Sequence, residues 1–255
     1  MARPACAPTT ARPITPPSCS TPTATTSKPY AWIEEPAMTQ IILHHYPDSF
    51  FAEKIRRILA FKNVQWHSVE QPMIMPKPGL TALTGGYRRV PVLQIGADIY
   101  CDTACIARRL ERLAPTPPVL PRALAGLAAT VEDWADRRLV SLIGPSVVVA
   151  RMATLPSGFL EDRAAMTPGL SEKALRFAAP HGWPQALAAF DRLDAQLDHS
   201  AFLLGEGFTL ADAACFHPLW FAKSVPALFA AVSARPALAA WFARIEAFGP
   251  AMPGR

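Results

Sequence analysis

A proline-rich stretch at residues 115–121 divides this chain into two parts with different patterns of secondary structure. Before it, short apolar segments of strand length alternate with segments of helical period, and after it only helical patterns follow. Strands and helices in alternation build a sheet covered by helices, whereas helices alone build a bundle. The chain of 255 residues, 51% of them hydrophobic, is long enough for both parts to bury a core. We therefore expect an α/β part followed by an all-α part.

The elements of the first part come in the order strand, helix, strand, loop, hairpin and helix. Segment 71–89 is the loop, with at most one helical turn, and Gly96 with Ala97 joins the two hairpin strands. This is the order of a thioredoxin-like α/β unit. The predicted strands are 40–45, 65–70, 91–95 and 98–101, and the predicted helices are 49–62 and 102–113.

The second part shows four helical patterns, and one of them begins with Thr209 and Asp212 three residues apart, the spacing of a capping box. We expect a first domain over 38–114, a linker over 115–121 and an all-helical domain over 122–255. The predicted helices of the second domain are 122–142, 184–199, 209–223 and 236–248.

Residues 1–37 differ in composition from the rest of the chain. They hold eight of its 27 prolines among many Thr, Ser and Ala, and they show no apolar period. Such a segment buries too little surface to offset its ordering entropy, so we expect it to be disordered. It lacks the apolar centre of a secretory signal, and a transit peptide is conceivable because it is poor in acidic residues. The simpler hypothesis is that Met38 is the true start.

The net charge of +5 is spread over scattered arginine pairs, which favours small anionic ligands and argues against nucleic acid as a partner. No run of about 18 apolar residues is present, so no membrane span is expected. The five cysteines show no metal spacing and suit a reducing compartment, which we take as cytoplasmic. His44 and His45 are adjacent on a strand and face opposite sides, so no metal site is expected there.

Val90 and Pro91 stand at the start of a predicted strand, where a proline is tolerated because it cannot donate to the sheet. In a thioredoxin-like unit this proline is cis, and the residue before it offers its backbone to a peptide-like ligand, as an added strand would. An ordinary turn is the alternative explanation of the same two residues.

Two helix starts carry polar side chains suited to a charged ligand. Asp102 and Thr103 begin one helix, where free N–H groups and the helix dipole suit a carboxylate and Asp102 can accept from an ammonium group. Ser49 begins the first helix, where a hydroxyl can donate to a sulfur and stabilise a thiolate. Helix capping alone also explains all three residues.

Taken together, these motifs resemble the cytosolic glutathione transferase superfamily. The stretch from Pro91 to Ile106 is similar to its Pro-x-Leu…Gly…Glu/Asp-Ser/Thr-x-x-Ile signature. Ser49-Phe-Phe-Ala-Glu-Lys-Ile-Arg56 resembles the omega-like Cys-Pro-Phe-Ala-Glu-Arg motif, and Lys77-Pro78, fourteen residues before Pro91, resembles a Lys-Pro of that class. The resemblance covers about residues 38–248 and implies a thioredoxin-like domain followed by an all-α domain.

The resemblance also implies roles in binding glutathione as a co-substrate. The backbone of Val90, beside Pro91, would pair with the cysteinyl part, Asp102 and Thr103 would hold the γ-glutamyl head, and Lys77 would meet the glycyl carboxylate. Phe51 would line the site, and Arg89 is added on charge grounds, with a solvated loop arginine as the alternative.

Ser49 occupies the catalytic position, and Tyr46 is the alternative hydroxyl. The omega-like motif has Cys where this chain has Ser49, so a mixed disulfide with glutathione cannot form there and thiolate activation is favoured. Phe50 replaces the usual Pro, and Asp102 is shorter than the usual Glu. The residues expected at the electrophile pocket are Tyr46, Phe50, Trp134, Arg138 and Trp220.

The chain is thus expected to be a homodimeric glutathione transferase of the detoxification type, which activates the glutathione thiolate for attack on a small hydrophobic electrophile. A glutathione-dependent isomerase or lyase remains an alternative, because only the acceptor pocket would differ. A non-catalytic binding protein with the same fold is a second alternative.

Overall fold

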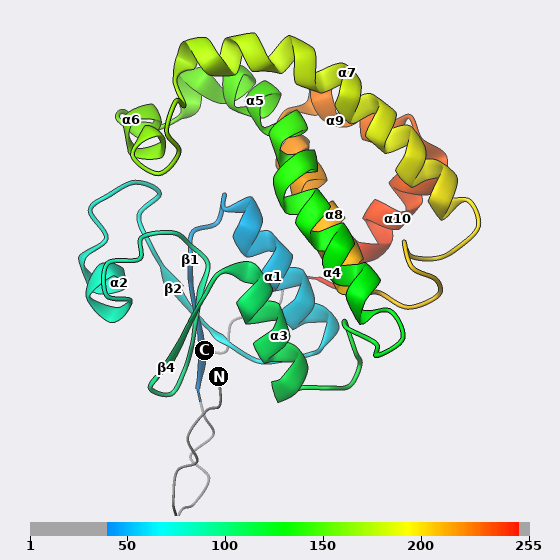
Figure 1. The fold of residues 1–255 in the computed structure, drawn as a ribbon, viewed down its shortest axis with the longest axis horizontal. Helices are drawn as coiled ribbons and strands as arrows, with labels where there is room; N and C mark the ends of the chain where they lie inside the picture. Colours follow the sequence, from blue (N-terminus) through cyan, green and yellow to red (C-terminus); the bar gives the residue numbers. More distant parts are fainter. Residues whose placement is uncertain (1–39, 250–255) are drawn as a thin grey trace, which may run out of the picture. The chain divides into compact units, whose positions relative to one another are not determined.

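The computed structural model describes residues 40–249, so the extension predicted over 1–37 lies outside the described residues. Within 40–249 the chain forms a four-stranded sheet with its helices and then a helical part (Figure 1). The strands are β1 (Ile41–His45), β2 (His67–Glu70), β3 (Val92–Ile95) and β4 (Asp98–Cys101). This confirms the expected α/β part followed by an all-α part.

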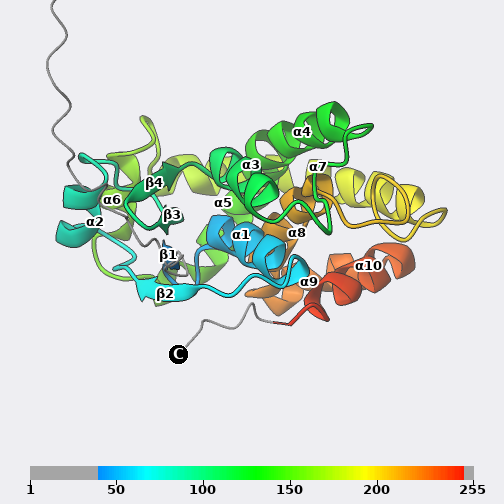
Figure 2. The same ribbon diagram turned by 90° about the horizontal axis from the view of Figure 1, so that it is seen from below.

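The sheet has the strand order β2-β1-β3-β4. β1 pairs in parallel with β2 and antiparallel with β3, where Leu43 faces Leu93, and β3 forms the predicted hairpin with β4. Helices α1 (Phe50–Phe61) and α3 (Thr103–Leu113) lie on one side of the sheet, and the short α2 (Pro78–Leu83) lies toward the other (Figures 1 and 2). β1 is therefore central, and its carboxyl end leads directly into α1.

Both helix starts singled out in the sequence are capped as expected. The Ser49 hydroxyl accepts from the N–H of Ala52 at 3.3 Å, and the Asp102 carboxylate accepts from the N–H of Ala104 at 2.9 Å. Asp102 has a φ of 73°, a positive value that is uncommon for a residue other than glycine. Each cap places a polar side chain at the positive end of a helix.

The helical part differs from the sequence prediction in its first half. The predicted helix 122–142 is α4 (Ala125–Trp134), a π-helical turn η1 (Ala135–Leu139) and α5 (Val140–Arg151), so it runs on through Pro145. The predicted helix 184–199 belongs to α7 (Glu172–Leu197), so the predicted start at Pro184 was wrong. The unpredicted elements are η2 (Met152–Thr154), α6 (Phe159–Ala164) and α9 (Pro226–Ser233).

Close packing explains why α7 continues through two prolines. Pro180 and Pro184 lie inside the helix, where each proline costs about 3 kcal/mol relative to alanine. α7 packs along α5 so tightly that a Cβ on Gly182 would lie 2.8 Å from the carbonyl oxygen of Leu142. The apolar contact between α5 and α7 compensates for the free energy that the two prolines cost, so α7 does not end at them.

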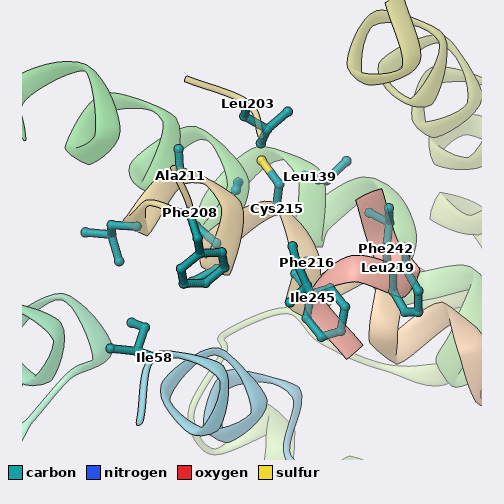
Figure 3. Packing of buried hydrophobic residues seen from close by; sticks show 14 of the residues in the cluster. Ile58, Leu139, Leu203, Phe208, Ala211, Cys215, Phe216, Leu219, Phe242 and Ile245 are labelled. Carbon is teal, nitrogen blue, oxygen red and sulfur yellow. The ribbon is translucent and has the colours of Figure 1, made fainter. Parts of the chain in front are cut away.

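The core is built around α8 (Leu210–Lys223), whose side chains are buried along most of its length. Figure 3 shows Cys215, Phe216 and Leu219 of α8 packed with side chains from η1 and from α10 (Pro236–Glu246). The carboxylate of Asp212 is buried and accepts from Thr209 N and Oγ1, Leu203 N and Trp241 Nε1. This capping residue therefore also ties α8 to α10.

No single helix among residues 40–249 has the length and apolarity to cross a membrane. Only α9 and α10 taken together pass that test, and they are bent by 112° relative to each other.

Candidate functional site

A cavity of about 420 Å³ opens where the loop before β3, the start of α3 and the helix α4 meet. It brings together six of the residues singled out in the sequence, which come from three separate segments. These residues are Phe51, Arg89, Val90, Pro91, Asp102 and Thr103. We call this space the first cavity.

Val90 presents unpaired backbone to the first cavity. The Val90–Pro91 peptide bond is cis, and β3 begins only at Val92. Within residues 40–249 no backbone hydrogen bond uses the N–H or the C=O of Val90. Both groups are therefore available to an extended peptide-like ligand.

The start of α3 meets the first cavity through two residues with different surroundings. Asp102 is exposed, whereas Thr103 is buried and its Oγ1 accepts from Lys54 Nζ at 3.2 Å. Because Thr103 accepts that bond, its own hydroxyl proton remains free to donate. The site combines a carboxylate with donors at a helix N-terminus, which suits a zwitterionic amino-acid head.

A buried group of charges forms the floor of the first cavity. Lys54 on α1 is fully buried and donates to Glu132 at 2.6 Å and to Asp136 at 2.8 Å. His217 Nε2 lies 2.9 Å from the second oxygen of Asp136. Burial alone would raise the pKa of Asp136, but the bond with His217 and the charge of Lys54 together lower it. Burial lowers the pKa of His217, so this histidine is neutral at pH 7.

Sequence reasoning missed several residues of this cavity. Tyr87 lies within the loop predicted over 71–89, and its charged neighbours Arg88 and Arg89 were the signal that could have pointed to it. The residues from the helices carry no such signal, because an acidic or basic residue on a helix is usually solvated. They are Arg108, Glu132, Asp133 and Asp136.

Ser49 and Lys77 do not line the first cavity. Ser49 is close in the chain to Phe51, which does line it, and Lys77 contacts Arg88, the neighbour of the lining residue Arg89. Ser49 is 4% exposed and directly precedes Phe50 and Phe51. Lys77 is buried, donates to the carbonyl of Arg88 at 3.3 Å and lies 5.7 Å from the centre of the Tyr46 ring. Burial, followed by the charge of Arg163, lowers the pKa of Lys77 to about 8.

A second cavity of about 430 Å³ lies on the other side of the first turn of α1. Tyr46 and Phe50 line it, and most of its other walls are aliphatic or aromatic. The apolar side chains from α5, α6 and α7 include Val140, Val148, Leu160 and Leu175. Phe50 and Phe51, whose ring centres are 4.7 Å apart, thus line different cavities.

Three other residues named from the sequence, Trp134, Arg138 and Trp220, do not line the second cavity. Trp134 packs against the hydrophobic core, and Arg138 donates to Gln185 at 2.5 Å on α7. Trp220 lines a third, smaller cavity of about 250 Å³ and has Arg56 stacked over it at 5.7 Å. The structure brings none of these three side chains to the second cavity.

Helix α6 is tied to the loop before β3 through charged side chains. Asp162 pairs with Arg88 and Arg163 and accepts from the N–H of Met75 at 2.9 Å. Arg163 also donates to the Tyr46 hydroxyl at 3.2 Å. The carboxylate of Asp162 therefore holds both the loop before β3, which lines the first cavity, and α6, which lines the second cavity.

Comparison with family profiles gives two matches along this chain. The family described as "Glutathione S-transferase, N-terminal domain" matches residues 43–118, and the family described as "Glutathione S-transferase, C-terminal domain" matches residues 132–244. Comparison with curated proteins gives no match.

Solved structures include several similar chains. A GST-like protein from Pseudomonas syringae is 40% identical, with a TM-score of 0.65, over 84% of this chain and 69% of that one. A glutathione S-transferase from Rhodospirillum rubrum is 20% identical, with a TM-score of 0.64, over 85% of this chain and 93% of that one. A beta-etherase from Sphingobium is 18% identical, with a TM-score of 0.63, over 83% of this chain and 96% of that one. The last two likenesses concern the fold alone.

Proposed function

The chain belongs to the glutathione S-transferase superfamily, and on this basis we propose that it is a glutathione transferase acting on small hydrophobic electrophiles. Glutathione occupies the first cavity and the electrophile occupies the second. The observation that carries this proposal is the placement of Phe50 and Phe51, which line the two cavities from the same helical turn. Ser49, directly before them, caps that turn.

The ligand follows the unpaired backbone of Val90 in this proposal. The cysteinyl part of glutathione pairs with the N–H and C=O of Val90, next to Pro91 and Phe51. The γ-glutamyl carboxylate meets the start of α3 and Thr103, and its ammonium group meets Asp102. The glycyl carboxylate meets Lys77, with Arg89 adding positive charge.

Ser49 is proposed to stabilise the thiolate. Its oxygen accepts from Ala52 N, which leaves the hydroxyl proton free to donate to sulfur. One hydrogen bond to a charged group together with the helix dipole can lower a thiol pKa by about two units, which corresponds to about 3 kcal/mol. The thiolate then attacks an electrophilic carbon, forms a carbon–sulfur bond and expels the leaving group with its electron pair.

Tyr46 is the alternative donor. Its hydroxyl lines the second cavity and accepts from Arg163, so its proton is also free. We further propose the domain boundaries 38–114 and 122–255 and a homodimeric assembly, on the basis of family membership.

The ultraviolet absorbance of the thiolate in the complex with glutathione tests the proposal. We expect the wild type to show thiolate at neutral pH, Ser49→Ala to shift its appearance upward by about two pH units, and Tyr46→Phe to leave it unchanged. The reverse pattern would assign the role to Tyr46. Calorimetry without any uptake of glutathione would overturn the proposed function as a whole.

A further inference from the structure

Arg151, the last residue of α5, has more donor capacity than the described part of the chain uses. Its side chain is 21% exposed and lines the second cavity. Among residues 40–249, the only hydrogen-bond acceptor of its guanidinium is Asp48, whose Oδ2 accepts from Nη2 at 2.8 Å. A guanidinium carries several donors in a rigid fork, so most of those of Arg151 remain without a protein acceptor.

The other arginine of the second cavity is already occupied. Arg163 pairs with Asp162, donates to the Tyr46 hydroxyl and to the carbonyl of Met73, and lies 4.4 Å from the centre of the Phe159 ring. Arg163 therefore serves to hold α6 against the loop before β3. Of the two arginines that residues 40–249 place on this cavity, Arg151 is the one that can accept an additional anionic partner.

The ion pair between Arg151 and Asp48 is weak enough for a competing anion to replace Asp48. The side chain of Asp48 is 49% exposed, so it can turn into water, and half-exposed ion pairs contribute about 0–1 kcal/mol. A ligand carboxylate can make two parallel hydrogen bonds to a guanidinium, where Asp48 makes one. An anion carried into the cavity can therefore replace Asp48.

The surroundings favour a ligand that is mostly apolar. Aliphatic side chains such as Val148, Leu155 and Leu160 line the second cavity beside Arg151. Asp48 and Arg151 also line the third cavity, together with Lys223, which is paired with Glu246. The guanidinium thus lies where an apolar space meets a more polar one.

We infer that the electrophile has an apolar body and one carboxylate, which binds Arg151 in place of Asp48 while the body fills the second cavity. This inference rests on the proposed function and names the substrate class of the same site. The carboxylate keeps its charge throughout, and only the carbon–sulfur bond forms as the leaving group departs. Arg151 is a specificity-determining residue in this scheme.

Two matched acceptors test the inference, 4-chloro-3-nitrobenzoate and its neutral amide, 4-chloro-3-nitrobenzamide. Each kcat/KM is divided by the rate constant of the same acceptor with free glutathione, which corrects for intrinsic reactivity. We expect the wild type to favour the benzoate by about tenfold or more, because hydrogen bonds between charged groups carry that much discrimination. Arg151→Met should abolish this preference, mainly through KM for the benzoate.

Three further variants keep the test decisive. Arg151→Lys should retain part of the preference, since it keeps the charge but loses the fork. Asp48→Asn should lower KM for the benzoate, because it removes the competing carboxylate. Arg138→Met, which changes an arginine outside the second cavity, should leave the ratio unchanged.

Equal corrected efficiencies for the two acceptors in the wild type, or an unchanged ratio in Arg151→Met, would overturn this inference and leave the proposed function standing. Absence of glutathione-dependent turnover of both acceptors, together with no binding of glutathione, would instead remove the proposed function.

Discussion

Lys54 Nζ lies 2.6 Å from Glu132 Oε1, and this ion pair joins α1 of the sheet-containing part to α4 of the helical part. Both side chains are buried, and Asp136 completes the contact at 2.8 Å. Removing one partner of a buried pair leaves an uncompensated charge. Lys54→Met should therefore lower the free energy of unfolding by about 3–5 kcal/mol, measured by urea denaturation.

An exposed ion pair on the same helical segment provides the control for Lys54. Arg137 and Asp133 pair at 2.5 Å with side chains 81% and 64% exposed. Arg137→Met should cost at most about 1 kcal/mol. The double variant Lys54→Met/Glu132→Leu should be more stable than Lys54→Met alone, because it removes a stranded carboxylate. If Lys54→Met and Arg137→Met lowered the free energy of unfolding equally, the greater contribution assigned to the buried ion pair of Lys54 would be contradicted.

Asp102→Asn separates the charge of this residue from its role as a helix cap. The amide oxygen can still accept from Ala104 N, and asparagine has nearly the same shape as aspartate, so the positive φ at this position adds no new strain. We expect the Kd for glutathione to rise about tenfold, because a charge-assisted bond to the ammonium group is lost, with little change in Tm.

Calorimetry and a thermal melt measure both effects of Asp102→Asn. Asp98→Asn is the matched control, since Asp98 is an exposed carboxylate of the β3–β4 hairpin and does not line the first cavity. A Kd that is unchanged in Asp102→Asn would remove Asp102 from the glutathione site.

The lowered pKa of Lys77 predicts that the affinity for glutathione depends on pH. Its pKa is lowered to about 8, chiefly by burial, so it is cationic below that pH and loses its proton as the pH rises through it. If the ammonium group of Lys77 holds the glycyl carboxylate, affinity is greatest below about pH 8 and falls above it. We expect the Kd to rise by up to about tenfold between about pH 7 and about pH 9.

S-methylglutathione is the ligand for this measurement, because its blocked sulfur does not titrate. Lys77→Arg is the control, since arginine stays charged over the whole range and the amine of the ligand titrates equally in both proteins. Parallel pH profiles for the wild type and Lys77→Arg would show that Lys77 does not meet the ligand.

Ser49→Cys should introduce the thiol chemistry that the serine prevents. A cysteine at the start of α1 has a lowered thiol pKa because of the helix dipole. With glutathione disulfide, its thiolate should attack one sulfur, form a mixed disulfide and release one glutathione thiolate. Intact mass and peptide mapping should find the glutathionyl group at position 49 in the variant and not in the wild type.

The five native cysteines set the background of that experiment, and two of them, Cys6 and Cys19, lie outside the described residues. Cys101 and Cys105 are at least partly exposed, whereas Cys215 is buried. Modification of the variant only at these positions, as in the wild type, would mean that residue 49 is out of reach of the bound sulfur.

The first part of the fold could be predicted almost element by element. Strands β3 and β4 and helix α3 agree with the prediction to within one residue, because a tight hairpin turn and a cap at Asp102 are signals carried by adjacent residues. The same holds for α8, which begins after the Thr209 and Asp212 pair. Most of the first-cavity residues named from the sequence lie beside such local signals.

The second part was predicted less well where packing outweighs local preference. Pro180 and Pro184 are helix breakers in isolation, and only the close approach of Gly182 to α5 shows why α7 continues through them. In the same way, the sequence put Trp134 and Arg138 on a helix but did not give the direction in which they point, and the structure packs Trp134 against the core and bonds Arg138 to Gln185. The face that a helix turns to a cavity depends on its neighbours.

By itself the sequence determined the order of elements as far as α3, the caps at Ser49 and Asp102, and the start of a strand beside Pro91, because each depends on residues next to one another. Only the tertiary structure decided which charges meet. Lys54 reaches Glu132 across 78 positions, and Arg151 reaches Asp48 across 103. Such pairs form only when packing brings distant segments together. Their contribution to stability depends on how deeply they are buried, which no local sequence pattern encodes.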